Sequence, residues 1–457
     1  MALGGVTGRA RPARLALILV TVVLACCAVV RARTGAPAGR GPTGPASPAA
    51  SRTQALPLIG AYYYLWYPEN LAGGSLGSHL APPAGPDPSD EISASPDDAA
   101  RAISQATSAG VDFFALDYWA NRLDLDARID SGFLQAPNLS STHFAINYET
   151  QALGPNVPYP ISTPMTAAAR ATLVANMVAI AQDYFNNPQY LRIEGRPVVF
   201  WYLSRTMTGD VAGAVNAVRV ALANMGYNIY IVGDEVFWRV TTVSGTETTA
   251  PQVDRARLFD AVTWYNLYDA STPALAGYGS QSSFLSASEG LADTYRTALG
   301  SQTPVIPDVL PGYNDRATRP KENHPAIPRQ WGPGDPDGSF LARELEGLAA
   351  PNIDPDVPML MVTTWNEWNE QTAVEPVSAT VATSRDDSST RTHYTQGYTY
   401  GGSGEGALDA LRAWAAGRTV VTASANPFDP SQDWRRFVHP ATKPGTKPGA
   451  KPATKGG

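Results

Sequence analysis

Short apolar runs alternate with amphipathic stretches along most of this chain. The apolar runs are rich in β-branched and aromatic residues and are bordered by Gly, Pro, Asn or Asp, which is typical of strands. They predict eight strands, over residues 56–64, 110–118, 142–148, 196–202, 228–233, 259–265, 304–310 and 358–365. The amphipathic stretches predict helices over residues 96–109, 165–184, 211–225, 288–299, 339–349 and 406–416.

Strands this uniformly apolar are buried on both faces, which favours a parallel sheet covered by helices. Eight of them alternating with helices predict an α/β fold, a (β/α)8 TIM barrel with extended βα loops. An open, doubly wound sheet is the alternative. That fold usually carries a glycine-rich phosphate-binding turn after its first strand, and the sequence GAYYYLWYPEN at residues 60–70 contains none.

The first 33 residues predict export from the cytoplasm. Arg9, Arg11 and Arg14 precede an apolar run over residues 15–30, the arrangement of a signal peptide or a signal anchor. No clear cleavage site follows, so the protein is expected outside the cytoplasm, either secreted or attached to the membrane by this segment. Residues 34–54 are predicted to be a Pro/Ala/Gly-rich disordered linker, 55–440 the catalytic domain, and 441–457 a Lys/Pro-rich disordered tail.

The net charge of −7 conceals an uneven distribution. Residues 1–50 contain six Arg and residues 441–457 contain four Lys, and neither segment contains an acid. Taking these ten from the 34 basic residues leaves 24 against 41 acidic ones, so residues 51–440 carry a charge of −17. An acidic surface of this kind repels phosphate backbones, so nucleic acid is excluded as a partner.

The residue types in the predicted domain narrow its chemistry. Cys26 and Cys27 lie in the apolar N-terminal run, and Lys321 is the single lysine between residues 51 and 440. Cysteine nucleophiles and disulfides are therefore excluded there, and Schiff-base or Walker-type phosphate chemistry is disfavoured. The five His are scattered without an HExxH-like spacing, so no metal and no cofactor is expected. Carboxylates and tyrosines remain as catalysts.

Functional residues of a barrel lie at the carboxyl ends of its strands and in the loops that follow. At these ends the sequence places aromatic rings beside amides and carboxylates, including seven of the ten Trp. Rings stack on the C–H faces of sugars, and the polar groups bind hydroxyls. For any one Trp, simple core filling is the alternative. The residues expected to bind a glycan are Tyr64, Trp66, Asp117, Trp119, Asn147, Glu149, Tyr202, Glu235, Trp264, Tyr265, Tyr313, Asp315, Arg316, Trp365, Asn366 and Trp368.

The densest polar cluster follows the eighth strand, in the sequence TTWNEWNEQTAVEP at residues 363–376. Glu367 and Glu370 are three residues apart, so a helical turn would bring both side chains to one face. Acetal cleavage uses such a pair, with one carboxyl protonated and the other ionised. Burial beside Trp residues and mutual repulsion are expected to raise one of the two pKa values. The spacing alone is common on solvated helices; its place after a strand favours catalysis.

Two segments make the chain resemble glycoside hydrolase family 99, the endo-α-mannosidases and α-mannanases, and related bacterial domains. The first is Asn366-Glu367-Trp368-Asn369-Glu370-Gln371-Thr372-Ala373-Val374-Glu375, similar to the family motif N-E-W-x-E-G-T-x-I-E. The second is Pro311-Gly312-Tyr313-Asn314-Asp315-Arg316, followed by Arg319-Pro320 and similar to P-G-Y-D-D…R-P. Weaker similarity in YYYLWY, GVDFFALDYW and NNPQYLRIEGRPVVFWY extends the resemblance over nearly all of residues 56–376.

The resemblance implies a barrel enzyme, a retaining glycoside hydrolase that cleaves internal α-mannosidic or related α-glycosidic bonds of a polysaccharide or glycan. By motif position, Glu367 would be the base that deprotonates the sugar 2-hydroxyl and so forms a 1,2-anhydro intermediate. Glu370 would be the general acid/base, and Tyr313 would line the subsite at the cleaved bond. No metal is implied, the expected partner is an α-mannan-like glycan, and the protein is expected to be a monomer.

Three positions depart from the family pattern. The family has His where Asn369 stands, Gly where Gln371 stands, and Glu where Asn147 stands, with Glu149 two residues further on. The carboxylate pair is intact, whereas the contacts with substrate are left open. Two alternatives to the α-mannosidase therefore stand: a sugar-binding or polysaccharide-assembly protein without hydrolysis, and a glycosidase of the conventional double-displacement type.

Overall fold

The computed structural model describes residues 54–67, 93, 95–154, 162–268, 281–315, 319, 326–377, 383–384, 399–400, 403–418 and 421–422. All of them belong to one compact unit, Ala50–Gly457. The predicted export segment, the linker up to residue 53 and the predicted tail lie outside the described residues. None of the described helices is both long and apolar enough to cross a membrane, and the apolar run at 15–30 was not among them.

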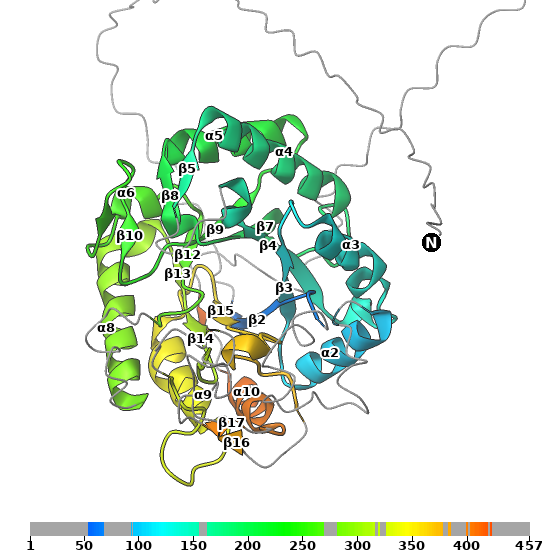
Figure 1. Cartoon of the computed structure of the whole chain (residues 1–457), viewed down its shortest axis with the longest axis vertical. Helices are drawn as coiled ribbons and strands as arrows, with labels where there is room; N and C mark the ends of the chain where they lie inside the picture. Colours follow the sequence, from blue (N-terminus) through cyan, green and yellow to red (C-terminus); the bar gives the residue numbers. More distant parts are fainter. Residues whose placement is uncertain are drawn as a thin grey trace, which may run out of the picture. The chain divides into compact units, whose positions relative to one another are not determined.

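The described residues contain a ring of eight parallel strand positions surrounded by helices (Figure 1). In chain order the strands are β2 (Leu58–Tyr63), β3 (Phe113–Tyr118), β4 (His143–Glu149), β7 (Arg196–Tyr202), β9 (Tyr230–Asp234), β12 (Ala261–Thr263), β13 (Val305–Ile306) with β14 (Asp308–Val309), and β15 (Met359–Val362). Each strand pairs with its neighbour in this order, and β15 pairs with β2. The predicted (β/α)8 barrel is therefore confirmed, and the doubly wound alternative is wrong.

The seventh strand closes the ring in two halves. β13 pairs with β12, and β14 pairs with β15. Pro307 separates the halves because it has no N–H to donate to a neighbouring strand. Its carbonyl oxygen still accepts from the Met361 N–H at 2.8 Å, so the strand remains part of the barrel.

The main helices are α2 (Pro96–Ser108), α3 (Leu123–Ser131), α4 (Ala167–Asp183), α5 (Val211–Asn224), α6 (Val253–Ala256), α8 (Gln281–Leu299), α9 (Ser339–Glu344) and α10 (Gly406–Ala416). The six predicted helices are confirmed, although α8 begins seven residues before its predicted start at 288 and a π-helix, Leu345–Ala349, completes the segment that α9 begins. The helices α3 and α6 were not predicted. Both are short and α3 is rich in Asp, so their apolar periodicity is weak.

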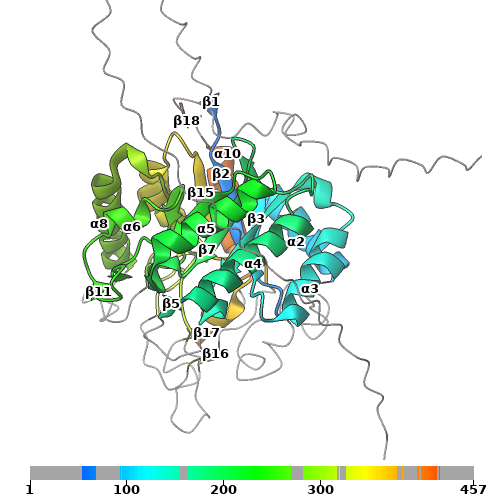
Figure 2. The same cartoon turned by 90° about the horizontal axis from the view of Figure 1, so that it is seen from above.

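Shorter elements occupy the connections. The short strands are β1 (Gln54–Ala55), β5 (Thr163–Met165), β6 (Arg192–Ile193), β8 (Met207–Gly209), β10 (Val240–Thr241), β11 (Glu247–Thr248), β16 (Thr383–Ser384), β17 (Thr399–Tyr400) and β18 (Val421–Thr422). The 3-10 turns are η3 (Phe133–Gln135), η4 (Leu139–Ser141), η5 (Thr150–Leu153), η6 (Ser204–Thr206), η7 (Gly300–Gln302), η9 (Ala350–Asn352) and η10 (Trp368–Glu370). In Figure 2, β1 and β18 lie at the end of the barrel where strands begin, and β16 and β17 at the end where they finish.

The helix α2 shows how local sequence begins an element. Ser95 caps it by accepting from the Asp98 N–H at 3.0 Å, and Pro96 supplies the fixed φ angle that suits a first helical turn. Ala99, Ile103 and Ala106 are buried on one side. This spacing of three to four residues places a single apolar stripe against the strands.

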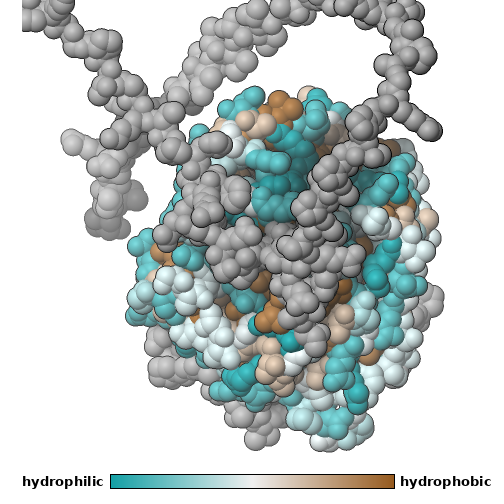
Figure 3. Space-filling view, turned by 180° about the vertical axis from the view of Figure 1, so that it is seen from behind, coloured by the Kyte–Doolittle hydropathy of each residue, from teal (hydrophilic) through white to brown (hydrophobic). Residues whose placement is uncertain are grey.

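Alternate residues of each strand face opposite sides of the barrel wall. One set packs with the helices and forms what we call the outer shell, which includes Trp201, Trp264 and Trp365. The other set fills the barrel interior, including Tyr62, Tyr64 and Phe200. Toward solvent, the face in Figure 3 carries mostly hydrophilic residues, with hydrophobic ones in small separate patches.

Candidate active site

Polar side chains occupy the interior of the barrel where its strands end. Asp117 on β3, Asn147 and Glu149 on β4, Asp234 on β9 and Asp308 on β14 are all buried. Deeper in the barrel the same strand faces carry apolar residues, as the burial pattern of the interior cluster shows. Buried carboxyl groups at strand ends are costly for stability and are characteristic of functional sites.

The segment after β15 presents Glu367 to this interior. Glu367 caps the 3-10 turn η10, and its Oε1 accepts from the Asn369 N–H at 2.9 Å and from the Tyr67 hydroxyl at 3.2 Å. The backbone N–H of Glu367 is held by Thr364 Oγ1 at 2.7 Å. Burial, and then the negative charge of Glu370, raises the pKa of Glu367 to about 8. Burial therefore gives this carboxyl a higher proton affinity than an exposed glutamate has.

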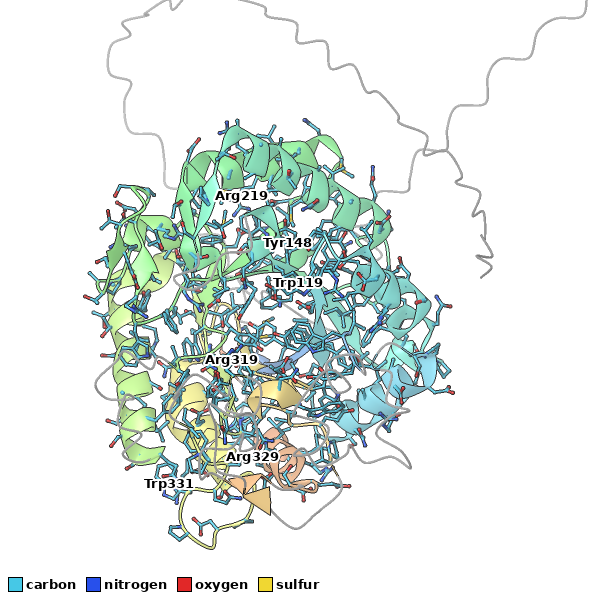
Figure 4. All side chains as sticks on the ribbon, viewed as in Figure 1. Trp119, Tyr148, Arg219, Arg319, Arg329 and Trp331 are labelled. Atoms are coloured by element: carbon cyan, nitrogen blue, oxygen red, sulfur yellow. The ribbon has the colours of Figure 1, made fainter. Side chains whose placement is uncertain are left out.

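Glu370 lies in a different electrostatic setting. Its Oε1 accepts from Arg319 Nη1 at 3.0 Å, and the same nitrogen donates to Asp315 Oδ2 at 2.7 Å. The Asn314 N–H donates to the Glu370 backbone oxygen at 2.8 Å, which attaches the loop after β14 to η10. A guanidinium at this distance favours an ionised carboxylate. Figure 4 shows Arg319 projecting over the centre of the barrel rather than toward its edge.

Three tyrosines, Tyr64, Tyr202 and Tyr265, form a cluster beside both glutamates; we call it the tyrosine cluster. The Tyr64 hydroxyl donates to that of Tyr265 at 2.7 Å, and the rings of Tyr202 and Tyr265 meet edge-on at 4.8 Å. Burial and then the charge of Glu370 raise the pKa of Tyr265, with a smaller contribution from Glu367. The two glutamates therefore converge on one place.

Tyr313 joins this group from the loop after β14. It is buried and stacks on Tyr268 at 4.3 Å. Burial and then the charge of Glu370 raise the pKa of Tyr313, which places its hydroxyl within electrostatic reach of that carboxylate. Trp368 packs against the ring of Tyr67 at 4.5 Å, and Trp66 stacks on Tyr64 at 4.2 Å.

A second carboxyl pair, Asp117 and Glu149, lies on the other side of the tyrosine cluster. The two side chains lie within hydrogen-bonding reach of each other, and burial raises the pKa of Asp117 to about 7 and that of Glu149 well above its usual range. Trp119 Nε1 donates to Asp117 Oδ2 at 2.7 Å, and Figure 4 shows Trp119 near the barrel centre. Asn147, on the same strand as Glu149, is buried with no partner for either amide atom.

Three predicted ligand residues lie elsewhere. Trp264 and Trp365 are fully buried in the outer shell: Trp264 Nε1 donates to the Asp308 carbonyl oxygen at 2.7 Å, and Trp365 meets Phe114 edge-on. Strand alternation explains this correction, because neighbours in sequence point to opposite faces. Glu235 is also no longer expected to bind the ligand, because its side chain forms a buried ion pair with Arg255 at 2.7 Å.

Asn366 and Arg316 were also predicted to bind the glycan. Asn366 does not face a ligand: its amide oxygen accepts from the Tyr64 N–H at 2.8 Å, and its amide nitrogen donates to the Tyr64 carbonyl oxygen at 2.9 Å. It ties the end of β2 to the segment that carries Glu367, so it positions other groups. Arg316 lies outside the described residues.

The departures from the family pattern have local structural roles. Asn369 Nδ2 donates to the Tyr67 hydroxyl at 3.1 Å, and so supports the group that binds Glu367. Gln371 has φ 58°, a left-handed conformation that glycine adopts most easily, which accounts for the glycine in the family motif. Arg329 Nη1 holds the Gln371 carbonyl oxygen at 3.0 Å.

Tyr67 and Arg319 are the site residues that sequence reasoning missed. Tyr67 lies in the run of aromatic residues after β2. Its contact is with Glu367, 300 positions away along the chain, and the local sequence contains no signal for it. Arg319 belongs to the R-P pair of the second motif. Only the fold of the intervening loop brings its guanidinium to Glu370.

The described residues contain no group of three or more His, Cys, Asp or Glu that could hold a metal ion. What the arrangement supplies is one carboxyl with a raised pKa, one carboxyl paired with an arginine, and several phenol hydroxyls around one place. Such a set can donate and accept protons at an oxygen-rich neutral ligand. The fold and this set of groups define a barrel of the glycoside-hydrolase type.

The fold is similar to those of two solved structures of the glycoside hydrolase type. The structure of the GH99 endo-α-mannosidase from Bacteroides thetaiotaomicron, in complex with bis-tris propane, is similar with a TM-score of 0.54 at 17% identity, over 79% of this chain and 96% of that one. A glycoside hydrolase-like protein is similar with a TM-score of 0.53 at 18% identity, over 81% and 97%. At these identities the likeness is one of fold. The described barrel therefore has the fold of the family 99 endo-α-mannosidase structure.

A family model described as glycosyltransferase WbsX matches residues 168–383. The match includes Tyr202, Tyr265, Tyr313 and the glutamate pair, and it excludes the strands that carry Asp117 and Glu149. No curated protein matches the chain by sequence. The descriptions of the family model and of the structural neighbours name different reactions.

Proposed function

We propose that this protein is a retaining glycoside hydrolase that cleaves internal α-mannosidic, or related α-glycosidic, bonds of a polysaccharide, with Glu367 and Glu370 as its catalytic pair. The observation that carries the proposal is the contrast between the two carboxyls. Burial raises the pKa of Glu367, whereas Glu370 is paired with Arg319. Acetal cleavage uses two carboxyls whose surroundings push their pKa values apart.

The roles of the two glutamates follow from the resemblance and the electrostatics together. The resemblance assigns Glu367 as the base for the sugar 2-hydroxyl and Glu370 as the general acid/base. Burial raises the pKa of Glu367, so a base at this position has to lose its proton when substrate binds. Glu370, which lies beside Arg319, has to hold a proton to act as general acid.

The reaction is tested with the purified protein on yeast α-mannan and on α-mannobiosyl fluoride. Release of oligosaccharides whose anomeric configuration is first retained, seen by NMR, supports the proposal. Glu344→Gln is the matched control for Glu367→Gln and Glu370→Gln. It makes the same change at a buried glutamate on α9, whose side chain accepts from the Leu310 N–H after β14. Binding without turnover, or products of inverted configuration, would exclude the retaining hydrolase.

A second candidate is a polysaccharide-assembly protein on the same barrel. The glycosyltransferase description of the family model over residues 168–383 favours it. Incubation with α-mannobiosyl fluoride and an acceptor oligosaccharide separates the two, since a transferase lengthens the acceptor and a hydrolase releases free sugar into water.

We further propose that the chain is exported, with residues 1–33 as a signal peptide or anchor. The basic residues before the apolar run support this. Fusing residues 1–54 to alkaline phosphatase, which is active only after export, tests it. Replacing the apolar run with a polar sequence of equal length is the control.

A further inference from the structure

The Asp117–Glu149 pair has no part in the proposed reaction. The two side chains point into the barrel from neighbouring strands and are buried within hydrogen-bonding reach of each other. A hydrogen bond between two carboxyl groups needs a proton, so the pair carries one negative charge when it holds a single proton. The tyrosine cluster adjoins this pair, since strand register places Tyr202 beside Glu149, and Tyr202 also lies within electrostatic reach of Glu370.

Several polar atoms around the pair have no hydrogen-bond partner among the residues that the structure describes. They are Asp117 Oδ1, Glu149 Oε2 and both amide atoms of Asn147. Asn147 is only 1% exposed, and strand register pairs it with Asp117, so all three side chains share the interior face. Buried polar atoms are normally satisfied. These atoms therefore mark a position for the donors of a ligand.

The pair also lacks a cation. Among the described residues, neither Asp117 nor Glu149 forms an ion pair, because Arg205 and Arg319, which reach this end of the barrel, bind other acids. A buried carboxylate without a counter-charge is costly. The shared proton lowers that cost, and a bound cation would take over its role.

We propose that Asp117 and Glu149, together with Asn147, bind the ammonium group of an amino sugar, so that the glycan used by this site contains sugars with a free amine. The inference rests on the proposed glycan function. An ammonium carries three N–H donors, which match one free oxygen on each of the three side chains. A metal ion would normally take further charged ligands, and the described residues contain no group of three that could hold one.

Aromatic and acidic neighbours favour the same ligand. Burial and then Tyr265 raise the pKa of Tyr64, with further contributions from Asp117 and Glu149, so its hydroxyl lies within electrostatic reach of the pair. Tyrosine rings attract ammonium groups through their π faces. Tyr64 also stacks on Trp66, a surface on which the sugar ring can lie.

Binding of an ammonium should release the shared proton. The other charged or titratable groups that face the pair are Asp126 on α3, Asp234 on β9 and the hydroxyls of the tyrosine cluster. Both aspartates increase the proton affinity of the pair. Affinity for the amine therefore rises with pH while the pair loses its proton, until the amine itself is deprotonated.

The experiment compares two forms of one ligand, an α-1,4-linked galactosamine oligosaccharide with free amines and its fully N-acetylated form, by titration calorimetry at pH 7. A mannan oligosaccharide of equal length is the neutral reference. We expect the free amine to bind at least about tenfold more tightly than the acetamide, as one buried ion pair can provide. Titration in two buffers of different ionisation enthalpy should show proton release for the amine alone.

Variants assign the effect to the pair. Asp117→Asn and Glu149→Gln keep the shape of the protonated side chains and should each remove the preference, whereas Glu344→Gln should retain it. Equal affinity for the two ligand forms overturns the proposal, as does a preference that survives in both pair variants. Stabilisation of the protein by Ca²⁺ that depends on Asp117 overturns it in favour of a metal site.

Failure here is distinguishable from failure of the proposed function. Turnover of α-mannan that depends on Glu367 can be measured on the same preparation. If turnover is present without an amine preference, the hydrolase stands and the amino-sugar inference is wrong. If the amine preference is present without turnover, the amino-sugar inference stands and the hydrolase proposal is wrong.

Discussion

The two faces of the barrel wall differ in what their side chains do, although they come from the same strands. Trp201, Trp264 and Trp365 face outward and complete an apolar shell under the helices. At the same height the inner face carries Glu149, Asp234 and other buried acids, several with unsatisfied oxygens. The outer face gains stability from packing, while the inner face gives up stability to hold polar groups ready for a ligand.

This contrast shows that parity along a strand, and not residue type, separates a ligand residue from a core residue. Tyr265 and Trp264 are adjacent aromatics, yet one belongs to the tyrosine cluster and the other to the outer shell. Substitutions on the two faces should therefore have opposite signatures, in activity for the inner face and in stability for the outer one.

The largest effect is expected on the inner face, at the catalytic pair. Glu367→Gln and Glu370→Gln should each lower the rate on α-mannan by about 10²- to 10⁴-fold, the usual contribution of one acid–base group. The variant at the general acid should keep most of its activity on α-mannobiosyl fluoride, because fluoride leaves without a proton from the enzyme. Initial rates on both substrates measure this, and equal losses on both substrates for both variants would contradict the assigned roles.

The outer face should give the reverse result. Trp365→Ala removes a fully buried ring and should lower the free energy of unfolding by about 3–5 kcal/mol, measured by urea denaturation. Mannan affinity of the folded fraction should be nearly unchanged.

Trp66→Ala is the matched inner-face change, since Trp66 is only half-buried and stacks on Tyr64. It should weaken glycan binding with a stability loss of below about 1 kcal/mol. A loss of affinity in Trp365→Ala as large as in Trp66→Ala would contradict the division between the faces.

Glu344 is an exception to the division between the faces, because it is a buried carboxyl that lies on α9, outside the barrel interior. Burial raises its pKa from 4.5 to about 8, and the Leu310 N–H donates to it at 2.7 Å. A raised carboxyl pKa means that the folded state binds the proton more tightly. Its stabilising effect is present below the unfolded pKa and is lost as pH rises through the folded one. Relative to Glu344→Gln, the wild type should lose about 1.4 kcal/mol of unfolding free energy per pH unit between pH 5 and 8.

Urea denaturation of the two proteins at a series of pH values measures this difference. A constant difference across the range would show that Glu344 titrates normally in the folded protein.

The smallest effect is expected at Arg319. Arg319→Gln removes the cation beside Glu370, and loss of a positive charge raises the pKa of nearby carboxyls. Because Glu370 is the assigned general acid, the alkaline limb of the pH–rate profile should move upward by about one unit. Arg319→Lys, which keeps the charge, should return the limb toward its original position. A lower rate with an unmoved limb would assign Arg319 to loop structure only.

Much of the fold was predictable because its signals are local. All eight strands and six helices follow from apolar periodicity, and the β7 bounds, Arg196–Tyr202, agree with the prediction at both ends. The break of the seventh strand at Pro307 and the helix α3 were not predicted. The break depends on the lack of an N–H at Pro307, which leaves one half of the strand paired with β12 and the other half with β15. The helix α3 depends on the packing of a weakly amphipathic segment.

The site was predictable in part for the same reason. Glu367, Glu370 and the residues at strand ends were found from position and from the resemblance to family 99. Glu235, Trp264 and Trp365 were included because a strand end cannot be located to one residue from sequence, and an error of one residue reverses the face. Arg319 reaches Glu370 across 51 positions, a contact for which the local sequence contains no signal.

The sequence by itself determined the barrel, the absence of cysteine chemistry in its domain and the glutamate pair after the eighth strand, because these depend on composition and short-range periodicity. Only the tertiary structure decided which aromatics face the interior, that burial raises the pKa of Glu367, and that Asp117 and Glu149 lie buried together. Those properties arise from burial and from charges that belong to distant parts of the chain. Desolvation and Coulomb interactions act through space, so they become defined only when the strands have closed into a ring.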